Sequence, residues 1–85
     1  MKNHFLLDVR TQEEFNESHI PGSTLIPLNE IPANLEKLRK ISKPILIICR
    51  SGSRAHAAQD YLKNQGITNT KVLEGGILKH GTEYQ

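Results

Sequence analysis

The sequence contains one cysteine, no tryptophan and no long apolar segment. A single cysteine excludes an intramolecular disulfide, and no cluster of cysteine and histidine has the spacing of a structural zinc site. The start of the chain lacks the apolar length of a signal peptide, and no run of residues is apolar for long enough to span a bilayer. We therefore expect a cytoplasmic protein with no membrane partner. Its cysteine is either an inert residue of the core or a reactive nucleophile.

Charge of either sign is also modest. Eleven lysines and arginines against nine acidic residues give a formal net charge of +2 at pH 7. No basic run is interleaved with aromatic residues, so no nucleic-acid partner is indicated. The chain has 85 residues, of which 36% are hydrophobic, and this supports one modest core. We expect a single domain over residues 1–85.

Short apolar runs alternate with helical patterns along the chain. The sequence predicts strands at residues 5–9, 24–26, 44–48 and 72–73, and helices at residues 11–18, 29–40 and 55–65. This alternation is typical of an α/β domain with a mainly parallel central sheet flanked by helices. The final stretch, residues 77–85, carries only a weak pattern.

Local signals define the ends of the predicted helices. Thr11, with Glu14 three residues later, forms a capping-box pattern for the first helix. Asn29 is a candidate N-cap for the second helix. Gly66 is expected to end the third helix as its C′ residue.

The stretch from Cys49 to Arg54 connects the most apolar strand to the third helix. Gly52 permits backbone angles that let consecutive N–H groups point inward, and the helix start adds free N–H donors and the positive end of its dipole. Such a site favours an anion, so we expect a lowered pKa for the Cys49 thiol and reaction as the thiolate.

The same loop carries two arginines. Arg50 and Arg54 add positive charge, and Arg54 lies near the helix start, where its forked donors can hold an anionic substrate. Arg50 is equally well explained as a solvated side chain. Ser51 and Ser53 are interpreted as loop or capping residues whose hydroxyls can reach the sulfur.

Asp8 lies near the end of the first predicted strand, and Glu74 directly follows the last one. Sites in parallel sheets lie beyond the carboxyl ends of the strands, so both residues should share an edge of the sheet with Cys49. We interpret Asp8 and Arg10 as a supporting pair rather than as catalysts. Glu74 is a candidate partner for Arg10 across this edge.

Four motifs resemble those of the rhodanese family, in the family's order and over nearly the whole chain, from Leu6 to about His80. They are Leu7-Asp8-Val9-Arg10 with Glu14-Phe15, His19-Ile20-Pro21-Gly22-Ser23, Cys49-x-x-Gly52-x-Arg54, and Glu74-Gly75-Gly76-Ile77. The resemblance implies a rhodanese-like fold with a parallel five-stranded sheet flanked by helices. It also implies sulfurtransferase chemistry, with Cys49 carrying the sulfur as a persulfide and the loop from Cys49 to Arg54 cradling it.

The chain departs from the family pattern in several places. Ser18 replaces a glycine, Ala55 replaces a serine and His80 stands where a tryptophan is common. The chain also begins almost at the strand containing Asp8, so the family's first edge strand is missing or very short. We therefore expect four to five strands.

The expected reaction is a two-step displacement without a metal or an organic cofactor. The Cys49 thiolate attacks thiosulfate or another small anionic sulfur donor, and cyanide, a thiol or a protein acceptor then takes the sulfur. Arg50, Arg54 and the helix start are expected to stabilise the departing anion. The substrate-binding residues are then Arg50, Ser51, Gly52, Ser53 and Arg54.

Two other function classes remain open. A cysteine phosphatase also needs an anion-binding loop, but its signature has five residues between cysteine and arginine, whereas four separate Cys49 from Arg54 here. A non-catalytic binding module or a sulfur carrier is the second alternative. The intact loop argues against pure binding but does not separate an enzyme from a persulfide carrier.

Overall fold

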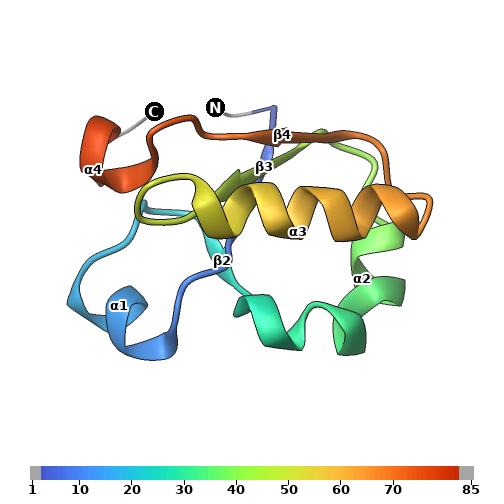
Figure 1. Ribbon diagram of the computed structural model, residues 1–85, viewed down its shortest axis with the longest axis horizontal. Coiled ribbons are helices and arrows are strands. Elements are labelled where there is room, and N and C mark those ends of the chain that lie inside the picture. The colour runs from blue at the N-terminus through green and yellow to red at the C-terminus, as the bar shows by residue number, and fades with distance from the viewer. Residues whose placement is uncertain (1–2, 83–85) are drawn as a thin grey trace.

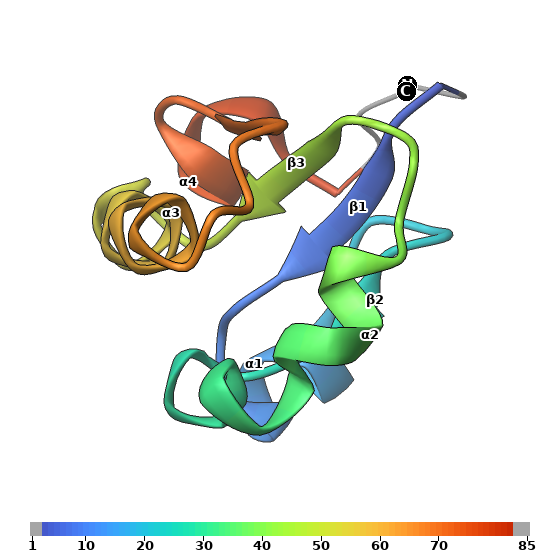
Figure 2. The ribbon, with the colours of Figure 1, turned by 90° about the vertical axis from the view of Figure 1, so that its right-hand side faces the viewer.

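The computed structural model describes residues 3–82, in which four parallel strands form one sheet in the order β2-β1-β3-β4. The strands are β1 (Phe5–Asp8), β2 (Thr24–Leu25), β3 (Ile45–Ile48) and β4 (Thr70–Val72). Figure 2 shows β1 and β3 side by side at the centre of the sheet. The α/β class, the parallel sheet and the lower of the two expected strand numbers are thus confirmed.

Helical segments separate the strands along the chain. They are α1 (Gln12–Glu17), the short 3-10 turns η1 (Leu28–Glu30) and η2 (Pro32–Asn34), α2 (Leu35–Arg39), α3 (Ser53–Asn64) and α4 (Gly76–His80). Figure 1 shows α1 and α4 at the end of the molecule where α3 begins, while α2 lies at the opposite end. None of the helices in residues 3–82 has the length and apolar character needed to cross a membrane.

The central strand β3 divides the core into two clusters because its side chains alternate between the two faces of the sheet. Ile45 and Ile47 join the larger cluster, which includes the buried side chains of α3 and of Leu38 in α2. Leu46 and Ile48 join a smaller cluster on the other face, where Ile77 of α4 packs. All four β3 residues are buried, so the strand that leads into Cys49 is fixed from both sides.

The capping box at the start of α1 is confirmed. Thr11 Oγ1 accepts a hydrogen bond from the Glu14 N–H at 3.2 Å, and Glu14 Oε1 accepts one from the Thr11 N–H at 3.0 Å. None of the α1 residues is buried. The position of α1 therefore depends on polar contacts made at its two ends.

The predicted helix at residues 29–40 is instead divided into η1, η2 and α2. Pro32 has no N–H and starts η2, so it interrupts the continuous hydrogen bonding of an α-helix. Asn29 lies inside η1 and is not an N-cap, which corrects the sequence prediction. Two apolar residues of this stretch, Ile31 and Leu38, are nevertheless both buried.

The remaining boundaries differ slightly from the predictions. Helix α3 begins at Ser53, two residues earlier than expected, and its buried side chains are Ala55, Ala58 and Leu62. Strand β4 begins earlier, at Thr70, because it pairs with β3 from that residue on. Helix α4 lies in the weakly patterned stretch that gave no element in the sequence analysis.

Candidate active site

Cys49 directly follows β3, and its side chain is only 1% exposed. The Gly52 N–H donates a hydrogen bond to Cys49 Sγ at 2.9 Å. Gly52 adopts φ +110°, a left-handed conformation that favours glycine, and it is the N-cap of α3. The sulfur therefore lies against an amide donor at the start of a twelve-residue helix.

The first turn of α3 completes the inner side of this loop. The first helical hydrogen bond runs from the His56 N–H to the Gly52 carbonyl at 2.9 Å. The N–H groups of the residues in between, 53–55, have no acceptor within the helix, as is general for the first turn. Together with the helix dipole, these donors favour negative charge beside the sulfur.

Helix α4 holds the outer side of the loop through its backbone. The Ile77 N–H donates to the Cys49 carbonyl at 3.0 Å, and the Leu78 N–H donates to the Arg50 carbonyl at 2.9 Å. These two bonds fix the carbonyls of the first loop residues toward α4. The loop is thereby oriented with its Gly52 amide toward the sulfur.

Gly76 makes this close approach possible. It adopts φ +58°, and a Cβ atom built on it would lie 2.5 Å from the Arg50 carbonyl oxygen and 2.6 Å from the Arg50 carbonyl carbon. Such distances are far inside van der Waals contact. The two glycines of the Glu74-Gly75-Gly76-Ile77 motif are thus the place where α4 meets the backbone of the loop.

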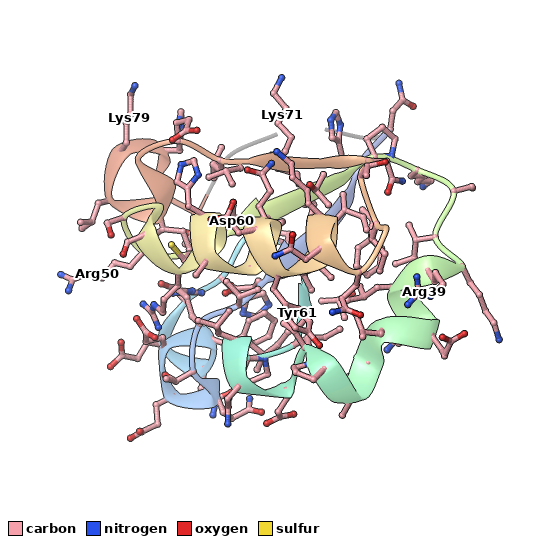
Figure 3. The ribbon with its side chains drawn as sticks, turned by 45° about the vertical axis from the view of Figure 1, so that its right-hand side comes forward. Arg39, Arg50, Asp60, Tyr61, Lys71 and Lys79 are labelled. Atoms are coloured by element: carbon pink, nitrogen blue, oxygen red, sulfur yellow. The ribbon has the colours of Figure 1, made fainter. Side chains whose placement is uncertain are left out.

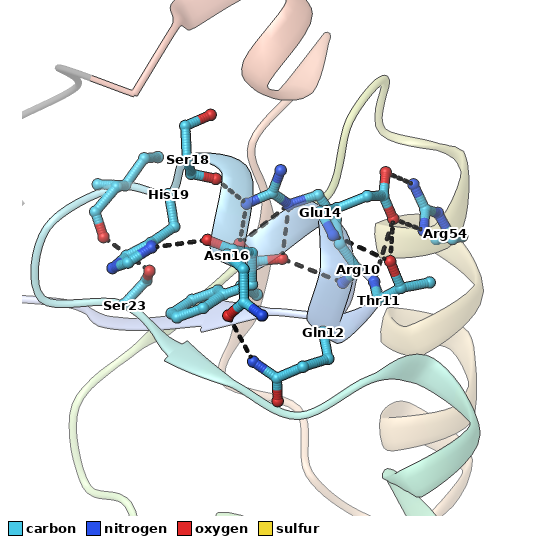
Figure 4. A network of polar contacts seen from close by, with 12 residues as sticks. Arg10, Thr11, Gln12, Glu14, Asn16, Ser18, His19, Ser23 and Arg54 are labelled. Atoms are coloured by element: carbon cyan, nitrogen blue, oxygen red, sulfur yellow. Dashed lines mark hydrogen bonds and ion pairs between the residues drawn. The ribbon is translucent and has the colours of Figure 1, made fainter.

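Arg54 is held by Glu14 of α1, as Figure 4 shows. Arg54 Nη1 and Nη2 donate to the two carboxylate oxygens of Glu14 at 2.7 and 2.9 Å. This hydrogen bonding, with a smaller contribution from the Thr11 N–H, lowers the pKa of Glu14 to about 2, and the same contact raises the pKa of Arg54. The forked donors of Arg54, predicted to hold a substrate, face a carboxylate instead.

Asp8 and Arg10 form a buried ion pair at the end of β1. Arg10 Nη2 lies 2.8 Å from Asp8 Oδ2, and Arg10 Nε donates to Asp8 Oδ1 at 3.0 Å. Arg10 Nη2 also donates to the Ser18 carbonyl at 2.8 Å. The pair that the sequence predicted therefore exists, and it connects the end of β1 to the end of α1.

Glu74 does not pair with Arg10, which corrects the sequence prediction. Its carboxylate lies 2.9 Å from His56 Nε2, at the surface. The reason is burial, since Arg10 is only 5% exposed and its guanidinium is bonded to Asp8 and Ser18. Glu74 thus belongs to the outer surface of the loop region.

The remaining loop residues lie at the surface. Arg50, Ser51 and Ser53 are exposed, and the Arg50 side chain extends away from the protein in Figure 3. No ion pair with Arg50 is found within residues 3–82. Arg50 is therefore the loop arginine whose charge is available to a ligand.

A groove of about 410 Å³ lies beside the loop, between α1 and α4. Its lining residues are Arg10, Glu14, Glu17, Ser18, Arg50, Ile77 and Leu78. Within the described part of the chain, no three histidine, cysteine, aspartate or glutamate side chains gather in a way that would hold a metal ion.

Two features of the site were missed by sequence reasoning. Glu14 was interpreted only as a capping residue, although it also binds Arg54 forty residues away. The amides of Ile77 and Leu78 were not considered because no helix was predicted there. The Glu-Gly-Gly motif was the available signal, because two consecutive glycines suggest close backbone approach.

The fold and the site together define an α/β domain whose only cysteine meets an amide donor at the carboxyl edge of a parallel sheet. A family model described as a rhodanese-like domain matches residues 1–81. The chain belongs to the rhodanese family, and the resemblance drawn from its four motifs is confirmed.

Individual relatives agree with this assignment. The chain is 35% identical over 79 residues to a sulfurtransferase of Allochromatium vinosum, covering 89% of this chain and 73% of that protein. It is 43% identical over 61 residues to the putative sulfur carrier protein YrkF of Bacillus subtilis, covering 72% of this chain and 32% of that protein.

A solved structure shows the same fold. The crystal structure of a rhodanese-like domain protein from Staphylococcus aureus superposes with a TM-score of 0.87 at 36% identity, covering 98% of this chain and 79% of that one. Together with the named relatives, it supports a rhodanese-type sulfurtransferase.

Proposed function

We propose that this protein moves a sulfane sulfur from a small anionic donor, such as thiosulfate, to cyanide or a thiol acceptor through a persulfide on Cys49. The main support is the position of the Cys49 sulfur, which is buried, accepts the Gly52 N–H and lies at the start of α3. A thiolate is the nucleophile in such chemistry, and this surrounding favours negative charge on sulfur.

In the first step, the Cys49 thiolate attacks the outer sulfur of the donor. A sulfur–sulfur bond forms to Cys49, the donor's own bond to that sulfur breaks, and the electron pair leaves with the donor remainder, which is sulfite when thiosulfate reacts. We propose that Arg50 binds the negative charge of the donor, because Arg54 is bonded to Glu14. Arg54 then acts mainly by tying the loop to α1.

In the second step, the terminal sulfur of the persulfide is held until an acceptor arrives. This sulfur is anionic, and the amides of the loop and of the first turn of α3 are the groups available to stabilise it. The proposed donors are the N–H groups of Ser51, Gly52 and Ser53. The acceptor attacks the terminal sulfur, and the electron pair of the broken bond returns to Cys49.

A sulfur carrier is the second candidate, and the similarity to the putative sulfur carrier protein YrkF supports it. Both functions require a persulfide on Cys49. They differ in turnover, because an enzyme releases its sulfur repeatedly to a small acceptor, whereas a carrier waits for one protein partner.

The first experiment is intact-mass analysis of the wild type and of Cys49→Ser after incubation with thiosulfate and then with cyanide, without reducing agent. We expect a gain of one sulfur on the wild type only, reversed by cyanide. Lys37→Ala, an exposed position of α2 away from the loop, is a suitable control. A wild type that gains no sulfur, or a Cys49→Ser protein that gains as much, overturns the proposal.

A further inference from the structure

The end of the molecule opposite the Cys49 loop carries a concentrated positive charge. Five exposed basic residues of α2, of the segment after it and of the last turn of α3 form a basic face: Lys37, Arg39, Lys40, Lys43 and Lys63. Two exposed carboxylates, those of Glu36 and Asp60, lie beside them in the same helices. The face thus has a formal charge of +3, whereas the whole chain has +2, so the positive charge of the molecule is localised here.

Tertiary contacts bring the two segments of the basic face together. Arg39 Nη1 donates to the Gln65 carbonyl, just after α3, at 2.7 Å. Asn69 Nδ2 donates to the Lys43 carbonyl at 3.0 Å. The segment after α2 is therefore fixed against the segment after α3, and a face with a fixed backbone loses little conformational freedom when a partner binds.

The stability of the helices accounts for only part of this charge. Arg39 and Lys63 lie in the last turns of α2 and α3, where a cation is favoured by the helix dipole. Lys40 and Lys43 lie at and beyond the end of α2, a helix of only five residues. Neither lysine has an ion-pair partner within residues 3–82, so both can bind carboxylates of another molecule.

The surroundings of these lysines favour a protein as the partner. Binding in a bilayer surface needs an apolar contact, but Leu78 is the only large apolar side chain exposed within residues 3–82, and it lies in α4 at the other end. Glu36, whose side chain is 82% exposed, lies among the lysines and repels a continuous row of phosphates. A protein can place single carboxylates opposite Lys40 and Lys43 and avoid Glu36.

We propose that the basic face binds an acidic protein, which holds this chain in place while the Cys49 loop stays open. The twelve residues of α3 separate the loop from the face by about 18 Å. This separation is about twice the Debye length at physiological salt, so a charge bound at the face has little effect on Cys49. Binding at the face is therefore independent of sulfur transfer, and the inference does not rest on the proposed function.

A photocrosslinking amino acid at position 42, between Lys40 and Lys43, captures the partner in cells that produce this chain. The same amino acid at position 12, on α1, is the control, because Ser42 and Gln12 are both exposed. The captured protein is identified by mass spectrometry and purified, and its Kd for the purified chain is measured by calorimetry. A duplex oligonucleotide and vesicles containing phosphatidylserine are measured in parallel.

Two double variants separate the basic face from net charge. Lys40→Ser with Lys43→Ser removes two cations of the face, and Lys71→Ser with Lys79→Ser removes two exposed cations elsewhere, at the positions labelled in Figure 3. The first should raise the Kd of the captured protein about fivefold, and the second less than about twofold. Loading Cys49 with sulfur should change the Kd by less than about twofold. Circular dichroism checks that each variant is folded.

An acidic captured protein that meets these expectations supports the proposal. The proposal is overturned if position 42 captures no protein beyond the control at position 12, or captures a second copy of this chain. It is also overturned if both double variants weaken binding equally, if the fivefold loss appears only with the oligonucleotide or the vesicles, or if sulfur loading changes the Kd. A wild type that takes up no sulfur overturns the proposed function and leaves binding at the basic face unchanged.

Discussion

Helices α1 and α4 brace the two sides of the Cys49 loop by different means. α1 uses side chains, since Glu14 binds Arg54, and the Asp8–Arg10 pair reaches the Ser18 carbonyl at its end. α4 uses backbone, since the amides of Ile77 and Leu78 bind loop carbonyls. The α1 side therefore sets the charge around the loop, whereas the α4 side sets the path of its backbone.

This difference predicts which property is lost when a residue on each side is substituted. A charge on the α1 side can be removed with little change of shape, so its loss should appear in stability and in the response to pH. The α4 side holds the loop through backbone hydrogen bonds and close packing, so a single added methyl group at Gly76 must move the loop. Three substitutions test this contrast, in order of decreasing expected effect.

Asp8→Asn should produce the largest loss of stability. It leaves the Arg10 guanidinium buried without a counter-charge, and breaking a buried ion pair in this way costs about 3 to 5 kcal/mol. Urea unfolding at pH 7 measures this loss. Glu13→Gln, on the exposed surface of α1, is the control and should change the free energy of unfolding by less than about 0.5 kcal/mol. A loss below about 1 kcal/mol for Asp8→Asn would contradict this role of the pair.

Gly76→Ala should displace the loop and reduce sulfur uptake by Cys49 at least about tenfold, with a stability loss of about 2 to 4 kcal/mol. Positive φ and the overlap with the Arg50 carbonyl both contribute. Gly22→Ala is a matched control, because Gly22 also has positive φ, +87°, but no atom within 4 Å of an added Cβ.

The comparison of these two glycine variants isolates the contact with the loop. Gly22→Ala should lose stability through backbone strain alone and keep the rate of persulfide formation, measured by intact mass over time. Equal rates for the two variants would show that close packing of α4 on the loop is not needed for sulfur transfer.

Glu14→Gln should have the smallest effect on stability, about 1 kcal/mol, because the ion pair with Arg54 is partly exposed and therefore screened by solvent. The pKa of Glu14 is lowered in the folded protein from 4.5 to about 2. The stabilisation is therefore fully present above about pH 4.5 and is lost as the pH falls through about 2.

Urea unfolding of the wild type and Glu14→Gln at several pH values measures this prediction. The difference between the two proteins should be constant above pH 4.5 and shrink below it. Glu36→Gln provides a matched control, because Glu36 pairs with Arg39 at 3.3 Å on the open surface of α2. If the difference for Glu14→Gln persists unchanged at pH 3, the ion pair is not its origin.

Much of the fold was predictable because its signals are local. The capping box of Thr11 and Glu14 spans three residues, and the stripe of Ala55, Ala58 and Leu62 lies within one helix. Pro32 is visible in the sequence, yet residues 29–40 were predicted as one helix. The error arose because apolar periodicity does not distinguish one helix from shorter turns that share a buried face.

The candidate site was predictable only in its parts. The sequence indicated that Cys49 follows a strand and precedes a helix, and the hydrogen bond from the Gly52 N–H agrees with the expected inward amides. The partners of the charged residues were not predictable. Glu74 was a candidate partner for Arg10 and lies against His56, and the contact between Arg54 and Glu14 was not foreseen.

The sequence by itself determined the alternation of strands and helices, the family and the place of the cysteine, because each of these depends on residues close together in the chain. Tertiary structure alone decided which charges neutralise each other and which remain free. Glu14 and Arg54 are 40 residues apart in the chain. The hydrogen bond from the Ile77 N–H to the Cys49 carbonyl forms only when α4 packs against the loop. Such contacts depend on how the helices pack against the sheet. Only the folded protein therefore shows that Arg50 has no ion-pair partner within residues 3–82.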